Sequence, residues 1–258
     1  MKNVKQFIRA VISLSILIGV WWAIAASGRF EPSLLPSPWK VWQGMFEMIK
    51  DGTLWTHVWI SLGRFFAGYL AAAVSGIVLG LIFGWYKKVW AFVDPIVQVL
   101  RPVSPIAWFP FIILWFGIGN APAVVIIFTA AFYPILLSTV AGVNRVDALY
   151  LKVAANFGIR QPQLLYKIIL PAAFPMIMNG LHMAIGSAWV FLVAGEMVGA
   201  QSGLGYLIID SRNALRSDLV LAGIIFIGIS GYFIDRLVRL IERIIEKQWG
   251  ILSEGGRT

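Results

Sequence analysis

Ionisable side chains are scarce in the apolar parts of this sequence, and four of them stand inside or beside long hydrophobic runs. They are Glu196, His182, Arg64 and Arg101. A charge surrounded by lipid is costly, so each of the four is a candidate for a transport pathway or gate. The alternatives are an interfacial or helix-end acid at Glu196, a packing histidine at His182, and arginines that reach toward lipid headgroups.

Metal and covalent chemistry lack the residues they need. The chain of 258 residues has no cysteine and only two histidines, His57 and His182. A cysteine nucleophile and a multi-histidine or thiolate metal site are therefore not expected within one copy. The sequence also has no Gly-rich phosphate loop ending in Lys and Ser or Thr, so we expect no ATP hydrolysis, no catalytic residue and no cofactor in this chain.

The elements that carry these residues are membrane helices. Hydrophobic residues make up 59% of the chain, charged residues 13%, and the mean hydropathy is +0.82. A helix needs about 20 apolar residues to cross a bilayer. We therefore expect an all-α integral membrane protein, a single transmembrane domain over residues 1–258. Its six spans are Ile8–Ala26, Phe65–Trp85, Pro105–Ile118, Pro122–Val143, Ala172–Val198 and Leu219–Ile234. The third is short and bounded by proline, and an earlier start near Val89 stays open.

The distribution of Lys and Arg predicts the orientation, because cytoplasmic loops retain these residues. With six spans and a cytoplasmic N-terminus, both termini are cytoplasmic and 15 of the 21 basic residues lie on that side. The same side has 6 of the 12 acids, so it carries 15 − 6 = +9, the whole net charge. A basic, aromatic-bearing soluble face for nucleic acid is not indicated. Cleavage of the first span as a signal peptide is an alternative.

Between the first two spans, the sequence predicts a helix that lies on the outer membrane surface. Ser37 is placed to cap it, Pro38 to begin it and Gly52 to stop it. Val41, Trp42, Met45, Phe46 and Ile49 share one face, opposite the polar Lys40, Gln43, Glu47 and Lys50.

The polar segment Asn144–Pro171 predicts a structured cytoplasmic element rather than a simple turn. Asp147 is placed to cap a helix over Ala148–Phe157, and Gly158 to close it in the left-handed conformation. Pro162 is placed to open a second short helix toward Leu170. Ala154 and Gly158 are four residues apart, which leaves a small surface for close approach by another protein.

This segment resembles the EAA signature of binding-protein-dependent ABC importer permeases. The matching residues run Val153-Ala154-Ala155-Asn156-Phe157-Gly158, then Ile168-Ile169-Leu170-Pro171. Lys152 occupies the position of the signature's Glu, and Val153 that of its first Ala. The resemblance implies a coupling loop over residues 144–171 that docks on an ATPase subunit. The residues it assigns to coupling are Val153, Ala154, Ala155, Asn156, Phe157, Gly158, Ile159, Arg160, Pro162, Leu170 and Pro171.

Further segments are similar to the nitrate, sulfonate, taurine and bicarbonate branch of that superfamily. They are Leu35-Pro36-Ser37-Pro38, Leu54-Trp55-Thr56-His57, Ser61-Leu62-Gly63-Arg64, Arg101-Pro102, Trp115-Phe116-Gly117-Ile118-Gly119, Ala194-Gly195-Glu196-Met197 and Ser202-Gly203-Leu204-Gly205-Tyr206-Leu207. The resemblance implies a type I importer permease in the bacterial inner membrane that moves a small anion. Its implied partners are a second copy, two ATPase subunits that bind ATP and Mg, and an extracytoplasmic binding protein.

Candidate pathway and packing residues follow from this interpretation. The pathway or gate set is Arg101, Ser104, Trp108, His182, Trp189, Glu196, Ser202, Gly203 and Gly205. Ser202–Gly205 is either a re-entrant loop at the pore or an ordinary external turn. Small-residue steps at Gly76, Gly80 and Gly84, and at Gly195 and Gly199, predict close helix packing, either within the chain or between two copies.

Other functions stay open at this point. A secondary transporter or channel would want buried ion-relay residues or inverted repeats, and neither is evident. An enzyme acting on lipid would want clustered His, Asp or Glu at the ends of the spans. A neutral vitamin precursor is an alternative substrate, because the separate binding protein of such importers largely sets specificity.

Overall fold

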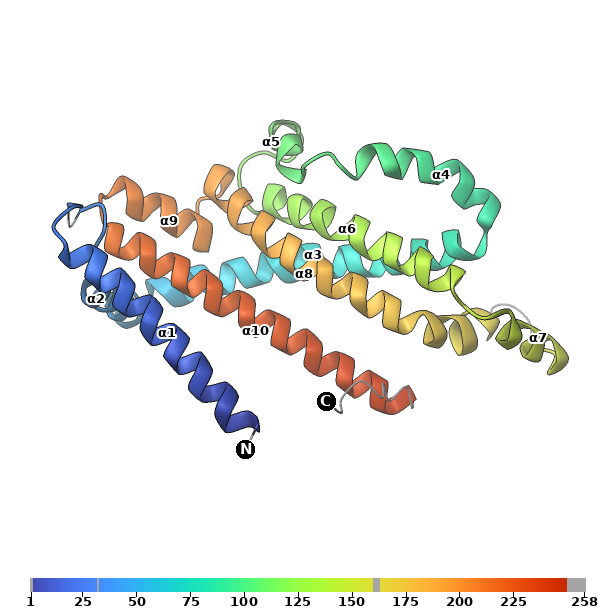
Figure 1. Cartoon of the computed structure of the whole chain (residues 1–258). Helices are drawn as coiled ribbons and strands as arrows, with labels where there is room; N and C mark the ends of the chain where they lie inside the picture. The colour runs from blue at the N-terminus through green and yellow to red at the C-terminus, as the bar shows by residue number, and fades with distance from the viewer. Residues whose placement is uncertain (1, 32, 160–162, 250–258) are drawn as a thin grey trace. The chain divides into compact units, whose positions relative to one another are not determined.

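The computed structural model describes residues 2–31, 33–159 and 163–249, and the regular elements in this part of the chain are all helices, without a β-strand (Figure 1). This confirms the all-α prediction. The α-helices are α1 (Lys2–Ala26), α2 (Pro38–Lys50), α3 (Thr53–Trp85), α4 (Lys87–Leu100), α5 (Phe109–Phe116), α6 (Asn120–Asn144), α7 (Ala148–Asn156), α8 (Leu170–Gly199), α9 (Leu204–Asn213) and α10 (Ser217–Trp249). A 3₁₀ turn, η1 (Pro105–Trp108), precedes α5, and a π turn, η2 (Leu165–Ile169), precedes α8.

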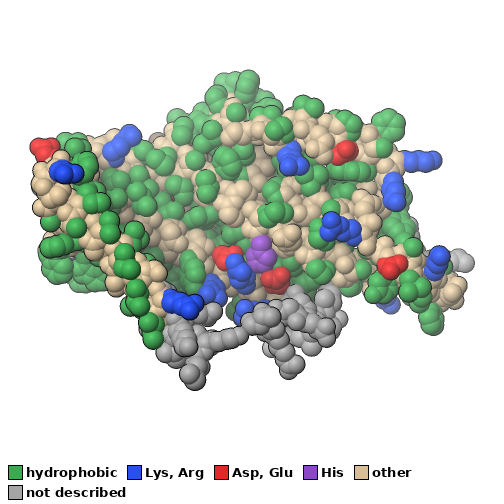
Figure 2. All heavy atoms as spheres, viewed as in Figure 1, with side chains coloured by type: hydrophobic (Ala, Val, Ile, Leu, Met, Phe, Trp, Pro, Cys, Tyr) green, Lys and Arg blue, Asp and Glu red, His purple; other side chains and the backbone are tan. Residues whose placement is uncertain are grey.

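Within the described residues, four helical segments are long and apolar enough to cross a membrane: α3, α6, Leu165–Gly199 and Ser217–Ile245. A fifth arises if α4 and η1–α5 are taken together as one bent span. The apolar part of α1, Val11–Ala26, is shorter than these. Its side chains Leu14, Leu17 and Trp22 are nonetheless exposed, which suits contact with lipid. Figure 2 shows hydrophobic side chains spread over the visible face, with charged side chains in small groups.

The third expected span, Pro105–Ile118, differs from the structure. The chain forms α4 first, leaves the helical path at Arg101–Ser104, and then forms η1 and α5 at an angle of 84° to α4. Pro102 and Pro105 explain the break, because proline lacks an N–H and disfavours helix at the residue before it. Gly117, at φ +72, ends α5. The expected span is the second half of a bent pair.

One compact unit consists of residues 1–60 and 202–228, and α2 packs within it. As predicted, the Ser37 side chain accepts a hydrogen bond from the Lys40 N–H at 3.3 Å, and Pro38 opens the helix. Arg216 links α2 to the start of α10, because its Nη2 lies 2.7 Å from the Glu47 carboxylate and 2.9 Å from that of Asp218. Gly44 permits the contact, because an added Cβ there would lie 2.9 Å from Leu219.

The predicted apolar face of α2 was only partly right. The side that packs inside the unit carries Val41, Gly44 and Met48, all buried. Trp42 and Phe46 are exposed on a second apolar strip. The helical pattern placed the two strips together because both are hydrophobic, although one faces protein and the other faces outward.

The second compact unit consists of residues 61–201 and 229–258, and α6 is its centre. Helices α6 and α8 run side by side (Figure 1). Small residues set the spacing: a Cβ added at Gly180 would lie 2.6 Å from that of Ser138. Part of the buried core lies in α6, at Ile126, Ile135 and Leu136.

The glycine steps in α3 are helix contacts inside the chain. Cβ atoms added at Gly76, Gly80 and Gly84 would lie 3.0 Å or less from Ile135, Thr139 and Val143 of α6. Gly195 and Gly199 likewise face Ile126 and Phe109. The packing prediction is confirmed, and these glycines face neighbouring helices of the same chain.

Candidate functional site

Helix α7 stands where the sequence predicts a capped cytoplasmic helix. The Asp147 carboxylate accepts a hydrogen bond from the Leu149 N–H at 2.9 Å and caps it. Gly158 takes φ +69 after the last turn, and its N–H donates to the Ala155 carbonyl at 3.0 Å. Both local predictions are confirmed. In Figure 1, α7 lies beyond the adjoining ends of α6 and α8.

Apolar side chains on α7 are mostly exposed, although α7 is too short and too polar to cross a membrane. Phe157 is 80% exposed, and Leu149, Tyr150 and Val153 are exposed too. Ala154 is buried, so it does not contribute to the small open surface predicted at Ala154 and Gly158. An exposed apolar group outside the spans is typical of a surface for another protein. We call Leu149, Tyr150, Val153 and Phe157 the α7 patch.

The second short helix predicted after Pro162 is not separate. Arg160 and Pro162 lie outside the described residues. From residue 163 the chain is helical and passes through the π turn Leu165–Ile169 directly into α8, so that Leu170 and Pro171 belong to one long segment, Leu165–Gly199. A π turn has one extra residue per turn, which makes room for the ring of Pro171 and its missing N–H.

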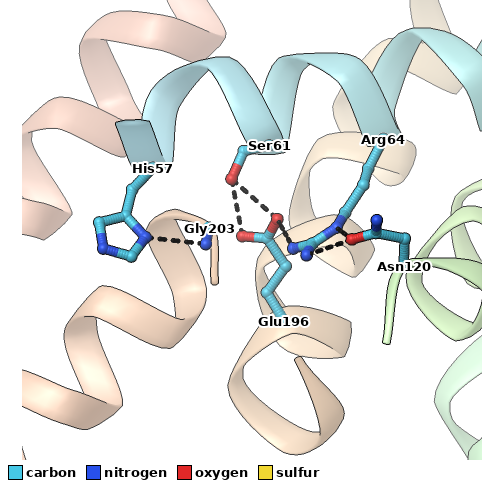
Figure 3. Close-up of polar contacts among 6 residues, drawn as sticks. All are labelled: His57, Ser61, Arg64, Asn120, Glu196 and Gly203. Carbon is cyan, nitrogen blue, oxygen red and sulfur yellow. Dashed lines mark hydrogen bonds and ion pairs between the residues drawn. The ribbon is translucent and has the colours of Figure 1, made fainter. Parts of the chain in front are cut away.

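Glu196 is fully buried in a polar cluster that joins α3, α6 and α8 (Figure 3). The Arg64 Nη1 lies 2.8 Å from its Oε1, and the Ser61 hydroxyl lies 2.8 Å from both carboxylate oxygens. Asn120, the first residue of α6, accepts from Arg64 Nε at 2.9 Å and from Nη2 at 2.6 Å. We call these four residues the Glu196 cluster.

This geometry disfavours the interfacial and headgroup alternatives left open by the sequence. An acid with no exposed surface is not interfacial, and Arg64, 5% exposed, does not reach a headgroup. The pair satisfies both charges, as burial requires. Arg64 is therefore no free anion site. Asn120 had no sequence signal, because an asparagine at a helix start is ordinary. Ser61 was named only within the segment Ser61–Arg64 that resembles the transporter branch, without a role of its own.

His182 takes part in a contact between α8 and α10. Its Nε2 lies 2.8 Å from a Glu242 carboxylate oxygen, and its Nδ1 is 3.8 Å from Asp235. Arg239 also pairs with Asp235, at 2.8 Å. Only Nε2 is within hydrogen-bond distance of an acid, and Nδ1 is buried without a hydrogen-bond partner among the described residues. The contact with α10 fits the alternative of a packing histidine. Trp189 is buried, and its ring lies edge-on to that of Phe65, with the centroids 5.5 Å apart.

The Ser202–Gly205 segment begins a helix within the first unit. Gly203 adopts φ +105 and precedes α9, while Leu204 and Gly205 are buried. The Gly203 N–H donates to His57 Nδ1 at 2.9 Å (Figure 3). This bond fixes the imidazole tautomer, because the accepting Nδ1 carries no proton. The segment is an ordered turn at a helix start.

Arg101 and Trp108 line a cavity of about 630 Å³ within the second unit. Its walls come from the bend after α4, from η1, and from α6 and α8. Ser104, the third predicted residue here, precedes η1 and is not part of the lining. No group of three His, Cys, Asp or Glu side chains that would suit a metal ion occurs in the described part of the chain.

Comparison with known proteins identifies the family. The model of the binding-protein-dependent transport system inner membrane component matches residues 76–247, a stretch that holds α7 and Glu196. The chain belongs to this family. It is thus a membrane permease component of a transport system, as its EAA-like segment predicted.

Named relatives cover nearly the whole permease. It is 34% identical to the taurine transport system permease protein TauC of Escherichia coli, over 93% of this chain and 89% of TauC. It is 35% identical to the nitrate import permease protein NrtB of Synechococcus elongatus, over 94% of this chain and 91% of NrtB. A solved structure of the MetNI methionine ABC transporter, in an inward-facing form, contains a chain of the same fold, with a TM-score of 0.57. The two chains are 20% identical over 72% of the permease and 94% of that chain.

Proposed function

We propose that this permease imports a small anion as the membrane subunit of an ATP-driven transporter in the bacterial inner membrane. The complex has a second copy of this chain, two cytoplasmic ATPase subunits that bind ATP and Mg, and an extracytoplasmic binding protein. Support for an anion comes from relatives named for taurine and for nitrate. Both termini of this permease, and α7, lie on the cytoplasmic side of the membrane.

The observation that carries the proposal is the α7 patch. It presents large apolar side chains on a helix outside the candidate spans, between two helices that do qualify as spans. A partner that binds this patch holds α6 and α8 at their adjoining ends. When the ATPase pair closes on ATP, the docked helices move together, and the pathway alternates between inward-open and outward-open states.

Gly158 gives a direct test of coupling. Nothing lies within 4 Å of a Cβ added there, so within this chain its glycine is required by φ +69 and not by space. A β-branched residue is strained in that conformation. We expect Gly158→Val to displace the end of α7 and to lose at least tenfold in ATPase co-purification, with normal membrane insertion.

Two variants make the test specific. Gly52 also has positive φ, +83, and open space around it, so Gly52→Val carries the same backbone strain away from α7 and should keep the ATPase. Gly158→Asn, which tolerates the left-handed conformation, should bind the ATPase better than Gly158→Val. Full ATPase association and transport by Gly158→Val would refute the assignment of α7 to coupling.

A further inference from the structure

The cavity behind the bend of α4 and η1 is lined by an unusual set of polar groups. Arg101 and Trp108 carry only hydrogen-bond donors, and neither has a hydrogen-bond partner among the described residues. Tyr133 and Ser138 also line the cavity, and their hydroxyls have no hydrogen-bond partner in this part of the chain. The cavity therefore offers donors that a bound acceptor would satisfy.

Acceptors are few in the same lining. No Asp or Glu is among the residues that line the cavity in the described chain. The other two hydroxyls are committed as donors to backbone carbonyls: Thr129 to Val125 at 2.9 Å and Ser187 to Ala130 at 3.2 Å. A cation bound here would have no counter-charge. An oxyanion would be bound by a guanidinium and by the N–H and O–H donors of the other lining residues.

The bend itself fits a binding role. Residues 101–104 are not helical, and they interrupt a pair of helices that together meet the criteria for a membrane span. Non-helical backbone at membrane depth is tolerated where it is covered by protein or lines a water-filled cavity. The break between α4 and η1 therefore places Arg101 at a cavity wall.

The rest of the lining is apolar and indicates the shape of the ligand. It consists of Leu100, Val103, Pro105, Ala130, Pro134, Leu137, Met183 and Phe191. An inorganic ion of a few atoms would occupy a small part of 630 Å³ and would leave these side chains against water. An oxyanion with an aliphatic stem would satisfy the donors and cover the apolar wall together.

We propose that this cavity binds an organic oxyanion of the sulfonate type. Its head group accepts from Arg101, Trp108 and Tyr133, and its stem lies against the apolar wall. This inference rests on the proposed function and adds to it that the permease itself distinguishes organic sulfonates from inorganic anions, independently of the binding protein.

Calorimetric titration of the purified full-length permease in detergent tests the proposal. Methane-, ethane- and propane-1-sulfonate and nitrate are the probes. Each added methylene should tighten binding about fourfold, and nitrate should bind at least about tenfold more weakly than propane-1-sulfonate. Arg101→Gln should lower the affinity for every sulfonate by at least about tenfold.

Matched variants separate binding from folding. Lys88 is exposed and lies outside the cavity lining, so Lys88→Gln removes one positive charge and should leave sulfonate affinity unchanged. Tyr133→Phe keeps the ring and removes the hydroxyl, so it should weaken binding several-fold even if Arg101→Gln fails to fold.

Three outcomes would overturn the proposal: affinity independent of stem length, nitrate binding as tightly as propane-1-sulfonate, or unchanged affinity in both Arg101→Gln and Tyr133→Phe. Each leaves the proposed function intact, because ATPase association is measured separately through Gly158. Loss of the proposed function would appear instead as a permease that never retains an ATPase, whatever the titration gives.

Discussion

At the scale of single residues, the Glu196 cluster makes the sharpest stability prediction. Glu196→Ala would leave the buried guanidinium of Arg64 without its carboxylate. We expect a loss of about 3–5 kcal/mol in unfolding free energy, because an unpaired buried charge keeps its full desolvation cost. The measurement is equilibrium unfolding of the purified permease in mixed detergent and SDS micelles.

An exposed ion pair provides the control for this prediction. The Arg216–Glu47 pair has side chains 40% and 52% exposed, so Glu47→Ala should cost less than about 1 kcal/mol. Replacing both partners of the buried pair, Arg64→Met with Glu196→Leu, should recover much of the loss, since no lone charge remains. Equal losses for Glu196→Ala and Glu47→Ala would show that the cluster does not stabilise the fold.

The sequence identified the members of this cluster only in part. Glu196 and Arg64 were candidates because each is charged inside or beside an apolar run, which the sequence alone shows. Their pairing spans 132 residues, and it depends on how α3 and α8 pack. Tyr133 and Ser138 gave no signal either, because an uncharged polar residue in a membrane helix is common. Their role follows from facing a shared cavity with Arg101.

At the scale of elements, close packing of α3 on α6 rests on small residues at fixed positions. A Cβ added at Gly80 would lie 2.5 Å from the Cβ of Thr139, which cannot move aside without its helix. We expect Gly80→Ala to force the helices apart and to lower the unfolding free energy by about 1–3 kcal/mol. Unfolding in mixed micelles measures this as well.

Gly63 is the matched control, because it belongs to the same helix and has nothing within 4 Å of an added Cβ. Gly63→Ala should be neutral or stabilise the helix by up to about 1 kcal/mol, since alanine has the higher helix propensity. If both alanines had the same effect, helix propensity would explain the result and the contact with α6 would not.

Capping and helix-breaking residues predicted the ends of some helices well. They failed where the course of the chain depends on packing between distant segments. Ser37 and Asp147 cap the helices they were expected to cap, because capping depends on neighbours two or three residues away. The third span begins in α4, as the earlier start near Val89 allowed, but its bend after Arg101 was not predicted, since η1 and α5 pack against α6. The two apolar strips of α2 were predicted as one face for the same reason. Hydrophobicity alone does not distinguish a side chain that packs inside the protein from one that is exposed on its surface.

At the scale of the whole molecule, the charge asymmetry predicts which side α7 occupies. The residues assigned to the cytoplasmic side include Arg101 and Asp94, and both lie within the bent pair of α4 and η1–α5. Without these two, the predicted cytoplasmic side has 14 basic and 5 acidic residues, or 14 − 5 = +9. The charge asymmetry therefore persists, and the predicted orientation depends on neither residue.

The absence of cysteine makes this orientation directly measurable. Every introduced cysteine is the only thiol in the permease. Phe157→Cys in the α7 patch should react with a membrane-impermeant maleimide in inverted vesicles and not in intact spheroplasts, and co-expressed ATPase should slow the reaction by covering the patch. Lys50→Cys at the end of α2 should show the opposite sidedness. Labelling of Phe157→Cys from outside would place α7 beyond reach of any cytoplasmic ATPase and would exclude the coupling mechanism, because no rearrangement of helices carries a loop across the bilayer.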